Sequence, residues 1–310
     1  MERKMKRRDF GLTVLAVVLA AVLVFLVIIA THMPDPAPGE STPGTAGTTA
    51  SAAPTTTVPE TTAPPETTVP PEKTSPPETT VPPTQAQEKY LVVIDPGHQA
   101  KANYDKEPVG PGAAEMKTKV SSGTQGKFTG LEEYKLTLSV SLILRDILEA
   151  RGYEVVMTRT THDVDLSNAQ RAAVANELQA DAFIRVHANG AENSDVNGIM
   201  TLCQTPGNPY NGYLYEACKR LSELVLEETV AATGAARQFV WETDTMSGIN
   251  WCTVPVTIVE MGYMSNERED RLMATEEYQK RIAAGIANGI DRYFEAVLSV
   301  KFGGFKGNSQ

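Results

Sequence analysis

Hydrophobic positions divide the chain into three parts. The first is an uninterrupted apolar run from Phe10 to Ala30, and the second, residues 32–88, has no apolar periodicity. From residue 89 onward, short apolar runs alternate with segments in which apolar residues recur at helical spacing. Only this third part has the pattern of a packed core. We therefore expect one globular domain at residues 89–300 and a flexible tail at residues 301–310.

Strands and helices are predicted to alternate along this domain. Short apolar runs predict strands at residues 90–94, 153–158, 182–186, 198–203 and 255–259. Helical spacing of apolar residues predicts helices at residues 129–151, 169–179, 213–232 and 278–297. The first helix is expected to begin with a capping box formed by Thr129 and Glu132. Such alternation predicts an α/β fold, in which a mostly parallel sheet is flanked by helices on both faces.

The N-terminal apolar run predicts a transmembrane signal-anchor at residues 10–31. Its 21 consecutive uncharged residues would form a helix of roughly 31 Å, about the thickness of a bilayer's hydrocarbon core. A cleaved signal peptide is the alternative, although its apolar region is usually shorter. Residues 1–9 carry five Lys or Arg against two acids. This predicts a basic cytoplasmic segment and places the rest of the chain across the membrane.

Residues 32–88 are predicted to form a disordered Pro/Thr-rich linker. They hold 14 of the chain's 20 prolines, 15 threonines and no aromatic residue, so they cannot bury enough apolar surface to offset the entropy of ordering. Four consecutive hexads, each ending in Pro-Pro, begin at Glu60 and favour polyproline II. A segment of this kind is a semi-rigid spacer that could extend up to roughly 180 Å.

The charge of the chain argues against a nucleic-acid partner. Residues 89–310 carry 22 Lys or Arg against 29 acids and have no basic stripe, whereas neutralising phosphates requires clustered positive charge. The three cysteines are an odd number and match no metal-binding or redox spacing. Neither nucleic-acid binding nor a cysteine-based metal site is therefore expected.

Candidate chemistry gathers at the ends of predicted strands. His98, His187 and Glu260 each follow such a strand, and in α/β sheets ligands collect at the carboxyl ends. Two neutral imidazoles and one carboxylate form an open catalytic zinc site with a position left for water. Glu132 and Glu133 could supply that carboxylate, and Glu133 is the better candidate because Glu132 suits the capping box. The HExxH spacing is absent, so on spacing alone histidines that only pack or hydrogen-bond remain the alternative.

Four motifs follow one another along residues 90–298. They are Val93-Ile-Asp-Pro-Gly-His98, Gly130-Leu-Glu-Glu-Tyr-Lys-Leu-Thr-Leu138, Arg185-Val-His-Ala-Asn189 and Ile258-Val-Glu-Met-Gly-Tyr-Met-Ser-Asn266. In content and order they resemble the motifs of zinc-dependent N-acetylmuramoyl-L-alanine amidases of the type 3 family. The resemblance implies that His98, Glu133 and His187 bind one Zn²⁺ and that Glu260 is the catalytic carboxylate.

The resemblance also implies an activity and a place in the cell. The expected enzyme is a peptidoglycan hydrolase that cleaves the amide between the lactyl group of N-acetylmuramic acid and L-alanine of the stem peptide. Zinc would lower the pKa of its bound water from about 15.7 toward 7, and Glu260 would take the proton and pass it to the leaving amine. Together with the predicted anchor, this implies a single-pass protein of the bacterial cell membrane, with the catalytic domain on the cell-wall side and peptidoglycan as its partner.

A different class of function remains as the alternative. The chain could be a membrane-tethered, non-catalytic domain that binds or senses the cell wall, with the same fold and an inactive metal site. Retention of all four expected site residues argues against this alternative.

Further residues have weaker expectations. Asp95 and Asn189 could orient the histidines or simply form turns, and Arg171 is expected in a salt bridge under the site. Residues 99–128 are longer than the family's usual connection and are expected to rim or cover the substrate groove. Trp241 and Trp251 are expected to be buried, with stacking on a sugar as the alternative.

Overall fold

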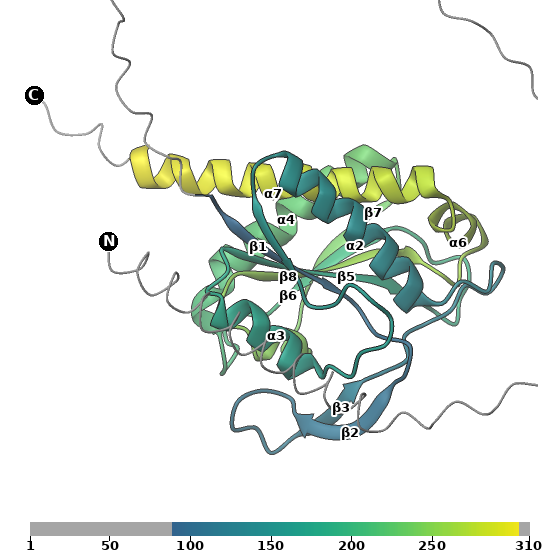
Figure 1. The fold of residues 1–310 in the computed structure, drawn as a ribbon, viewed down its shortest axis with the longest axis horizontal. Coiled ribbons are helices and arrows are strands. Elements are labelled where there is room, and N and C mark those ends of the chain that lie inside the picture. The colour runs from purple at the N-terminus through teal and green to yellow at the C-terminus, as the bar shows by residue number, and fades with distance from the viewer. Residues whose placement is uncertain (1–88, 304–310) are drawn as a thin grey trace, which may run out of the picture. The chain divides into compact units, whose positions relative to one another are not determined.

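A six-stranded sheet forms the centre of the computed structural model, which describes residues 89–303 (Figure 1). The strands are β1 (Leu91–Pro96), β4 (Glu154–Met157), β5 (Ala182–Asn189), β6 (Ile199–Cys203), β7 (Arg237–Glu242) and β8 (Val256–Tyr263), in the order β4-β1-β5-β8-β6-β7. Strands β4, β1, β5 and β8 are parallel to one another and β7 is parallel to β6, whereas β6 pairs antiparallel with β8. The prediction of a mostly parallel sheet is thus confirmed.

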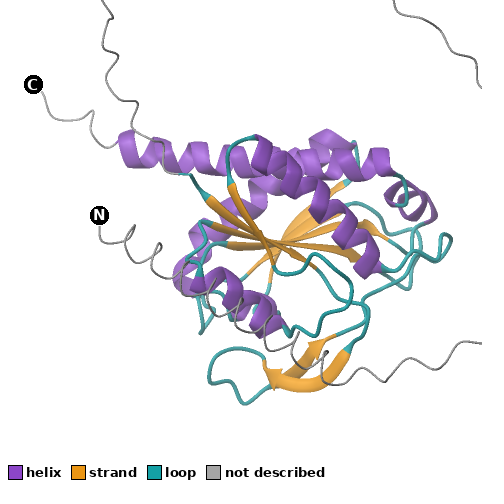
Figure 2. Ribbon diagram, in the orientation of Figure 1, coloured by secondary structure: helices purple, strands orange, loops and turns teal. Residues whose placement is uncertain are grey.

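Helices cover both faces of this sheet, as the sequence predicts (Figure 2). Helices α2 (Glu133–Ala150), α4 (Tyr215–Thr233) and α7 (Glu276–Gly303) pack on one face, and α3 (Asn168–Glu177) and α5 (Ser247–Asn250) on the other. Along β1, Val92 and Ile94 face the first layer, while Leu91 and Val93 face the second. Because successive side chains of a strand point to opposite faces, a strand buried on both faces is apolar at nearly every position.

The beginning of α2 differs from the prediction. The helix begins at Glu133, and Glu132 occupies the N-cap position without a side-chain capping bond. The hydroxyl of Thr129 instead donates to Asp270, whose carboxylate also accepts from the backbone N–H groups of Phe128 and Thr129. The predicted capping box was therefore wrong, because a carboxylate distant in sequence binds the residue that was expected to cap the helix.

Residues 99–128 contain a β-hairpin that the hydrophobic pattern does not predict. Strands β2 (Asn103–Pro108) and β3 (Met116–Val120) pair antiparallel and form a separate small sheet. The hairpin is attached to the main domain by side chains of the α5 region. The indole of Trp251 donates to the carbonyl oxygen of Pro108 at 2.9 Å, and Asn250 donates to that of Val109 at 3.1 Å. Residues 99–128, the insertion, are therefore hydrogen-bonded to the main domain and form part of its surface.

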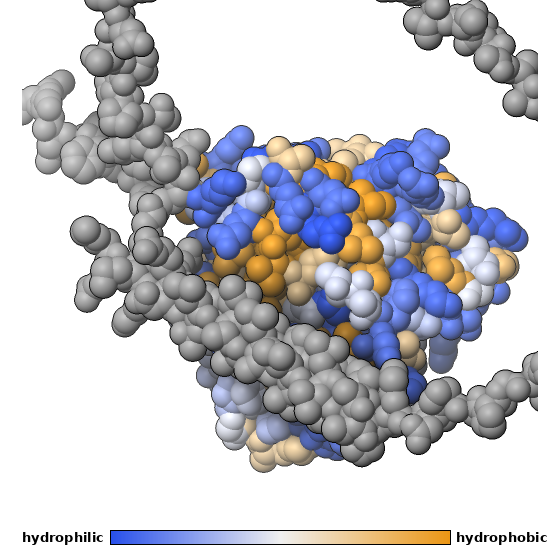
Figure 3. Space-filling model, in the orientation of Figure 1, coloured by the Kyte–Doolittle hydropathy of each residue, from blue (hydrophilic) through white to orange (hydrophobic). Residues whose placement is uncertain are grey.

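Several further features of the domain bear on the sequence predictions. Helix α7 continues to Gly303, beyond its predicted end at residue 297, and the short helix α6 (Glu267–Met273) precedes it. All three cysteines are free and buried. Hydrophobic residues on the face drawn in Figure 3 form patches among larger hydrophilic areas.

Within residues 89–303, no helix combines the length and apolarity that crossing a membrane requires. The predicted anchor and linker lie outside these residues.

Candidate active site

The predicted site residues come from four separate elements. His98 lies two residues beyond β1, Glu133 is the first residue of α2, and His187 and Glu260 lie near the carboxyl ends of β5 and β8. His187 and Glu260 are register partners on these parallel strands, about 5 Å apart in backbone position. The two residues therefore lie inside their strands rather than just after them. They are nevertheless at the carboxyl ends of the strands, as predicted.

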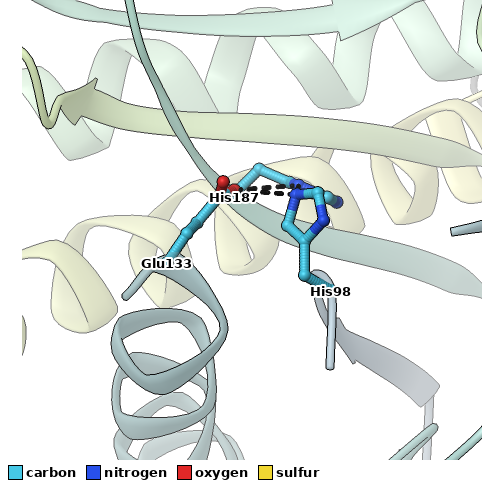
Figure 4. A group of neighbouring side chains, drawn as sticks. All are labelled: His98, Glu133 and His187. Carbon is cyan, nitrogen blue, oxygen red and sulfur yellow. Dashed lines mark hydrogen bonds and ion pairs between the residues drawn. The ribbon is translucent and has the colours of Figure 1, made fainter. Parts of the chain in front are cut away.

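Three of these side chains converge on one point (Figure 4). Nε2 of His98 lies 3.1 Å from Oε1 of Glu133, and Nδ1 of His187 lies 3.2 Å from each of these two atoms. Ligands of a tetrahedral zinc ion, at about 2.0–2.1 Å from the metal, lie roughly 3.3–3.4 Å from one another. The triangle of ligand atoms thus matches one face of a zinc tetrahedron, and the donor set fits the metal.

Hydrogen bonds fix the orientation of His98 and Glu133. The carbonyl oxygen of Ser121 lies 2.9 Å from Nδ1 of His98. Because a carbonyl only accepts, Nδ1 carries the proton and Nε2 keeps its lone pair for a metal. Glu133 accepts from the backbone N–H of Ala188 through Oε1 and from that of Thr124 through Oε2. Ser121 and Thr124 belong to the insertion, so this segment orients two of the three candidate ligands.

The backbone of His98 has an unusual conformation. Its φ is +59°, in the left-handed region that residues with a Cβ rarely adopt. Nη2 of Arg171 donates to the carbonyl oxygen of His98 at 3.0 Å and holds this conformation. Strain of this kind persists where the surroundings over-determine it, which is typical of functional sites.

His187 is in the protonation state that a metal ligand needs. Burial, opposed by Glu133 and aided by the neighbouring charges of His98 and Arg185, lowers the pKa of its imidazole to about 4. The ring is therefore neutral at pH 7. Its Nε2 is buried and has no hydrogen-bond partner within residues 89–303.

Glu260 shares a pocket of about 250 Å³ with both histidines. Its Oε2 is buried and has no hydrogen-bond partner in the part of the chain that the structure describes. Burial, followed by the charge of Glu133, raises the pKa of this carboxyl to about 8, although Arg185 opposes the shift. A carboxyl with a pKa near neutrality can both accept and donate a proton.

Two buried arginines form ion pairs with Asp95 next to the candidate site. Asp95 accepts from Arg171 at 2.7 Å and from Arg185 at 2.9 Å, which confirms the salt bridge expected for Arg171. Burial would raise the pKa of Asp95, but the charges of these two guanidinium groups and the hydrogen bond from Thr158 outweigh it and hold the pKa well below its usual range. Asp95 makes no hydrogen bond to either candidate histidine ligand, and its oxygens accept from Thr158, Arg171 and Arg185. Of the two roles considered for Asp95, orienting the histidines by a direct hydrogen bond is therefore not seen.

Two other sequence expectations are settled by contacts. Asn189 accepts from the backbone N–H of Gly190 and makes only a weak contact with Met200, so it serves the turn rather than the histidines. Trp251 is half-buried, but Trp241 is 44% exposed on the edge strand β7. The expected burial of Trp241 was wrong.

The sequence did not lead us to predict that Arg185 lines the pocket. Arg185 lines the same pocket as His98, His187 and Glu260. A signal was available, because Arg185 stands two residues before His187 and alternate residues of a strand share a face. Arg159 was also missed. It is buried in a loop after β4 and donates to the carbonyl oxygens of Pro96 and Gly97.

Fold and site together define an α/β protein with a candidate metal-dependent hydrolytic centre. Comparison with known proteins specifies the family. Residues 92–292 match the model of the amidase 3 family, described as N-acetylmuramoyl-L-alanine amidase, and the chain belongs to this family.

Individual proteins show the same relationship. The uncharacterised protein YqiI of Bacillus subtilis is 31% identical over 174 residues, which cover 56% of this chain and 79% of that protein. N-acetylmuramoyl-L-alanine amidase AmiA of Salmonella typhimurium is 23% identical over 242 residues, covering 66% and 76% of the two chains. The solved apo structure of an N-acetylmuramyl-L-alanine amidase from Mycobacterium abscessus is similar at a TM-score of 0.60 and 26% identity, covering 66% of this chain and 98% of that one.

Proposed function

We propose that this protein is a zinc-dependent peptidoglycan hydrolase that cleaves the amide between the lactyl group of N-acetylmuramic acid and L-alanine of the stem peptide. The observation that carries the proposal is the convergence of His98, Glu133 and His187 beside Glu260 in one pocket. Membership of the amidase family supports the same reaction. His98 would hold the metal through Nε2, His187 through Nδ1 and Glu133 through Oε1.

The chemistry divides between the metal and the protein. When bound, zinc supplies a Lewis acid that lowers the pKa of water from about 15.7 toward 7 and polarises the carbonyl of the amide. The carboxylate of Glu260 accepts the proton of the attacking water and returns it to the nitrogen of the leaving L-alanine. Because Oε2 of Glu260 has no protein partner among residues 89–303, it is available for both transfers.

Two substitutions test these roles in the full-length protein. Glu260→Gln keeps the shape of the side chain but cannot accept the proton, so we expect zinc content near that of the wild type and a loss of turnover of at least about a hundredfold. His187→Ala removes a ligand, and we expect a loss of bound zinc together with activity.

The measurements are metal analysis and the release of stem peptides from purified peptidoglycan. Near-normal turnover by Glu260→Gln would contradict the role of Glu260. A wild-type protein that binds zinc and cell wall but releases no peptide would support the non-catalytic alternative instead.

We also propose that the protein is a single-pass protein of the bacterial cell membrane, with the catalytic domain on the cell-wall side. The support is the uncharged run at residues 10–30 with its basic flank, followed by the Pro/Thr-rich residues 32–88. Peptidoglycan is the partner that this arrangement would serve, because the spacer could carry the domain away from the membrane surface.

A further inference from the structure

Three buried arginines lie beside the candidate active site, and one of them differs from the other two. Arg171 donates hydrogen bonds from all three nitrogens, to Asp95, to Gln99 and to three backbone carbonyls. Arg159 likewise uses all three nitrogens, and its acceptors are four backbone carbonyls and the hydroxyl of Thr137. Their donors are therefore occupied by the protein itself.

Arg185 has a nitrogen to spare. Its Nε donates to Asp95 at 2.9 Å and its Nη2 to Asn168 at 2.8 Å. Its Nη1 has no hydrogen bond to any residue that the structure describes, although the side chain is only 3% exposed. The residue lines the pocket that holds His98, His187 and Glu260. A buried guanidinium thus presents an open donor to the proposed active site.

The surroundings leave space for this nitrogen. Nη1 lies directly against Gly248, where any Cβ would overlap it. Only glycine at this position allows the guanidinium group to reach the pocket between α5 and the sheet. Gly248 also lines the pocket, so the open donor is at its wall.

No carboxylate of the described residues accepts a hydrogen bond from this donor, so it is open to an anion of the substrate, while the charge of Glu260 in the same pocket also acts on Arg185. Asp95 is the one carboxylate that accepts from Arg171 and Arg185, and Arg159 has only neutral acceptors. In a site shielded from water, a guanidinium with free N–H groups binds a carboxylate strongly and with defined geometry.

The position of Arg185 matches the peptide side of the substrate. Arg185 precedes His187 by two residues on the same face of β5, which places their backbones about 6.6–7 Å apart. The residue that follows L-alanine carries its α-carboxyl group at most about two residues from the scissile amide, a reach of up to roughly 7 Å. A substrate whose amide lies at His187 could therefore bring this carboxyl group to Arg185.

We propose that Arg185 is a specificity-determining residue that binds, through Nη1, a free carboxylate on the residue following L-alanine. This inference rests on the proposed function, because it takes the scissile amide to lie beside His187 and Glu260. It makes the protein selective for stem peptides in which that carboxyl group is free rather than converted to the carboxamide.

The test uses two synthetic compounds that differ in one group. One is N-acetylmuramoyl-L-alanyl-glutamate with a free α-carboxylate, and the other carries the α-carboxamide. For the full-length wild-type protein we expect kcat/KM to be about ten- to a hundredfold higher for the acid. Arg185→Met should bring this ratio close to one, mainly through loss on the acid. Gly248→Ala, which displaces Nη1 but keeps the charge, should lower the ratio as well.

Arg171→Met is the matched control, because it also removes a partner of Asp95 but no donor that faces the pocket. We expect it to slow both compounds alike and to leave the ratio unchanged. A wild-type ratio near one would overturn the proposal without reference to any variant. An equal loss of the ratio in Arg171→Met would also overturn it, since the preference would then belong to the ion network as a whole.

Binding separates this inference from the proposed function. Calorimetry with the Glu260→Gln protein should show the acid binding about tenfold more tightly than the carboxamide. Equal affinities would overturn the role of Arg185. Absence of hydrolysis of both compounds by a zinc-loaded wild type would contradict the proposed function, while the ratio of affinities would still test Arg185.

Discussion

The ring of His187 is held against the backbone of Gly97. A Cβ at Gly97 would lie 2.6 Å from both ring nitrogens of His187, a distance that forces the imidazole to move. We therefore predict that Gly97→Ala lowers zinc affinity at least tenfold, the scale seen when the support of a metal ligand is lost. Competition with a chromophoric chelator measures this affinity. Gly207→Ala is the control, because its Cβ would meet only Thr205 Oγ1 at 3.7 Å; an equal effect there would contradict the explanation.

The sequence predicted which residues form the site better than it predicted which residues they bind. His98, His187 and Glu260 stand at strand ends in the sequence, and Glu133 begins a helix, so topology alone brings them to one edge. A salt bridge of Arg171 was predicted, but not that Asp95 accepts from both Arg171 and Arg185. Whether Asp95 binds a histidine or an arginine depends on the distances between side chains on neighbouring strands. The hydrophobic pattern of the sequence gives no information on these distances.

Asp95 provides a prediction about stability. Asp95→Asn would leave Arg171 and Arg185 without their buried counter-ion, and breaking a buried ion pair costs about 3–5 kcal/mol. We expect a loss of that size in the free energy of unfolding, measured in urea. Asp146→Asn is the control, because Asp146 pairs with Arg145 at the surface, where such pairs contribute about 0–1 kcal/mol.

The same carboxylate predicts a dependence on pH. Because folding lowers the pKa of Asp95, its stabilising contribution is complete above the unfolded pKa of about 3.9. The contribution is lost as the pH falls below that value and through the lower pKa of the folded state. The difference in unfolding free energy between wild type and Asp95→Asn should thus be constant from pH 5 to 7 and shrink in stronger acid. A difference that grows on acidification would contradict this assignment.

At the level of elements, the insertion is the part that the sequence describes least well. Strands β2 and β3 carry mainly polar residues, most of them exposed or half-buried, so they have no apolar alternation to reveal them. Their position is fixed by polar contacts to Trp251, Asn250 and Ala169. Strand β7 was not predicted for a related reason. Its exposed positions carry Phe239 and Trp241 instead of polar residues, so it does not show the usual alternation of apolar buried and polar exposed residues. The strands buried on both faces were predicted because burial makes them continuously apolar.

The attachment of the hairpin can be tested at Trp251. Trp251→Phe removes the hydrogen bond to the carbonyl oxygen of Pro108, and we expect a loss of about 1 kcal/mol in unfolding free energy. Hydrogen exchange of residues 103–120 should rise more than that of the central sheet. Trp241→Phe is the matched control, because its indole is 44% exposed and a surface change of this kind stays within about 0.5 kcal/mol. Similar effects of the two changes would contradict the proposed attachment.

At the level of the whole molecule, metal binding should stabilise the folded domain. The three candidate ligands come from β5, α2 and the loop after β1, so they assemble only on folding and zinc binds the folded state preferentially. At a free zinc concentration a hundredfold above Kd, the stabilisation is about 2.7 kcal/mol, or roughly 5–10 °C in Tm. We expect a chelator to lower Tm by this amount and added zinc to restore it. An unchanged Tm would contradict a zinc site formed by these residues.

The linker connects the proposed anchor to the proposed activity. Removing the four hexads, residues 60–83, would shorten an extended polyproline II spacer by about 74 Å. We predict that hydrolysis of a small soluble substrate is unchanged, because the deletion leaves every residue of the site in place. Release of peptides from the wall of intact cells should fall, because a domain held at the membrane, as proposed, would reach less of the polymer.

A scrambled sequence of the same length and composition separates reach from recognition. If the hexads act only through length and stiffness, the scrambled linker should restore release from the wall in full, since proline content sets the extension of the chain. Failure of the scrambled linker, with normal hydrolysis of the soluble substrate, would show that the order of residues in the hexads matters and that the linker binds a ligand of its own.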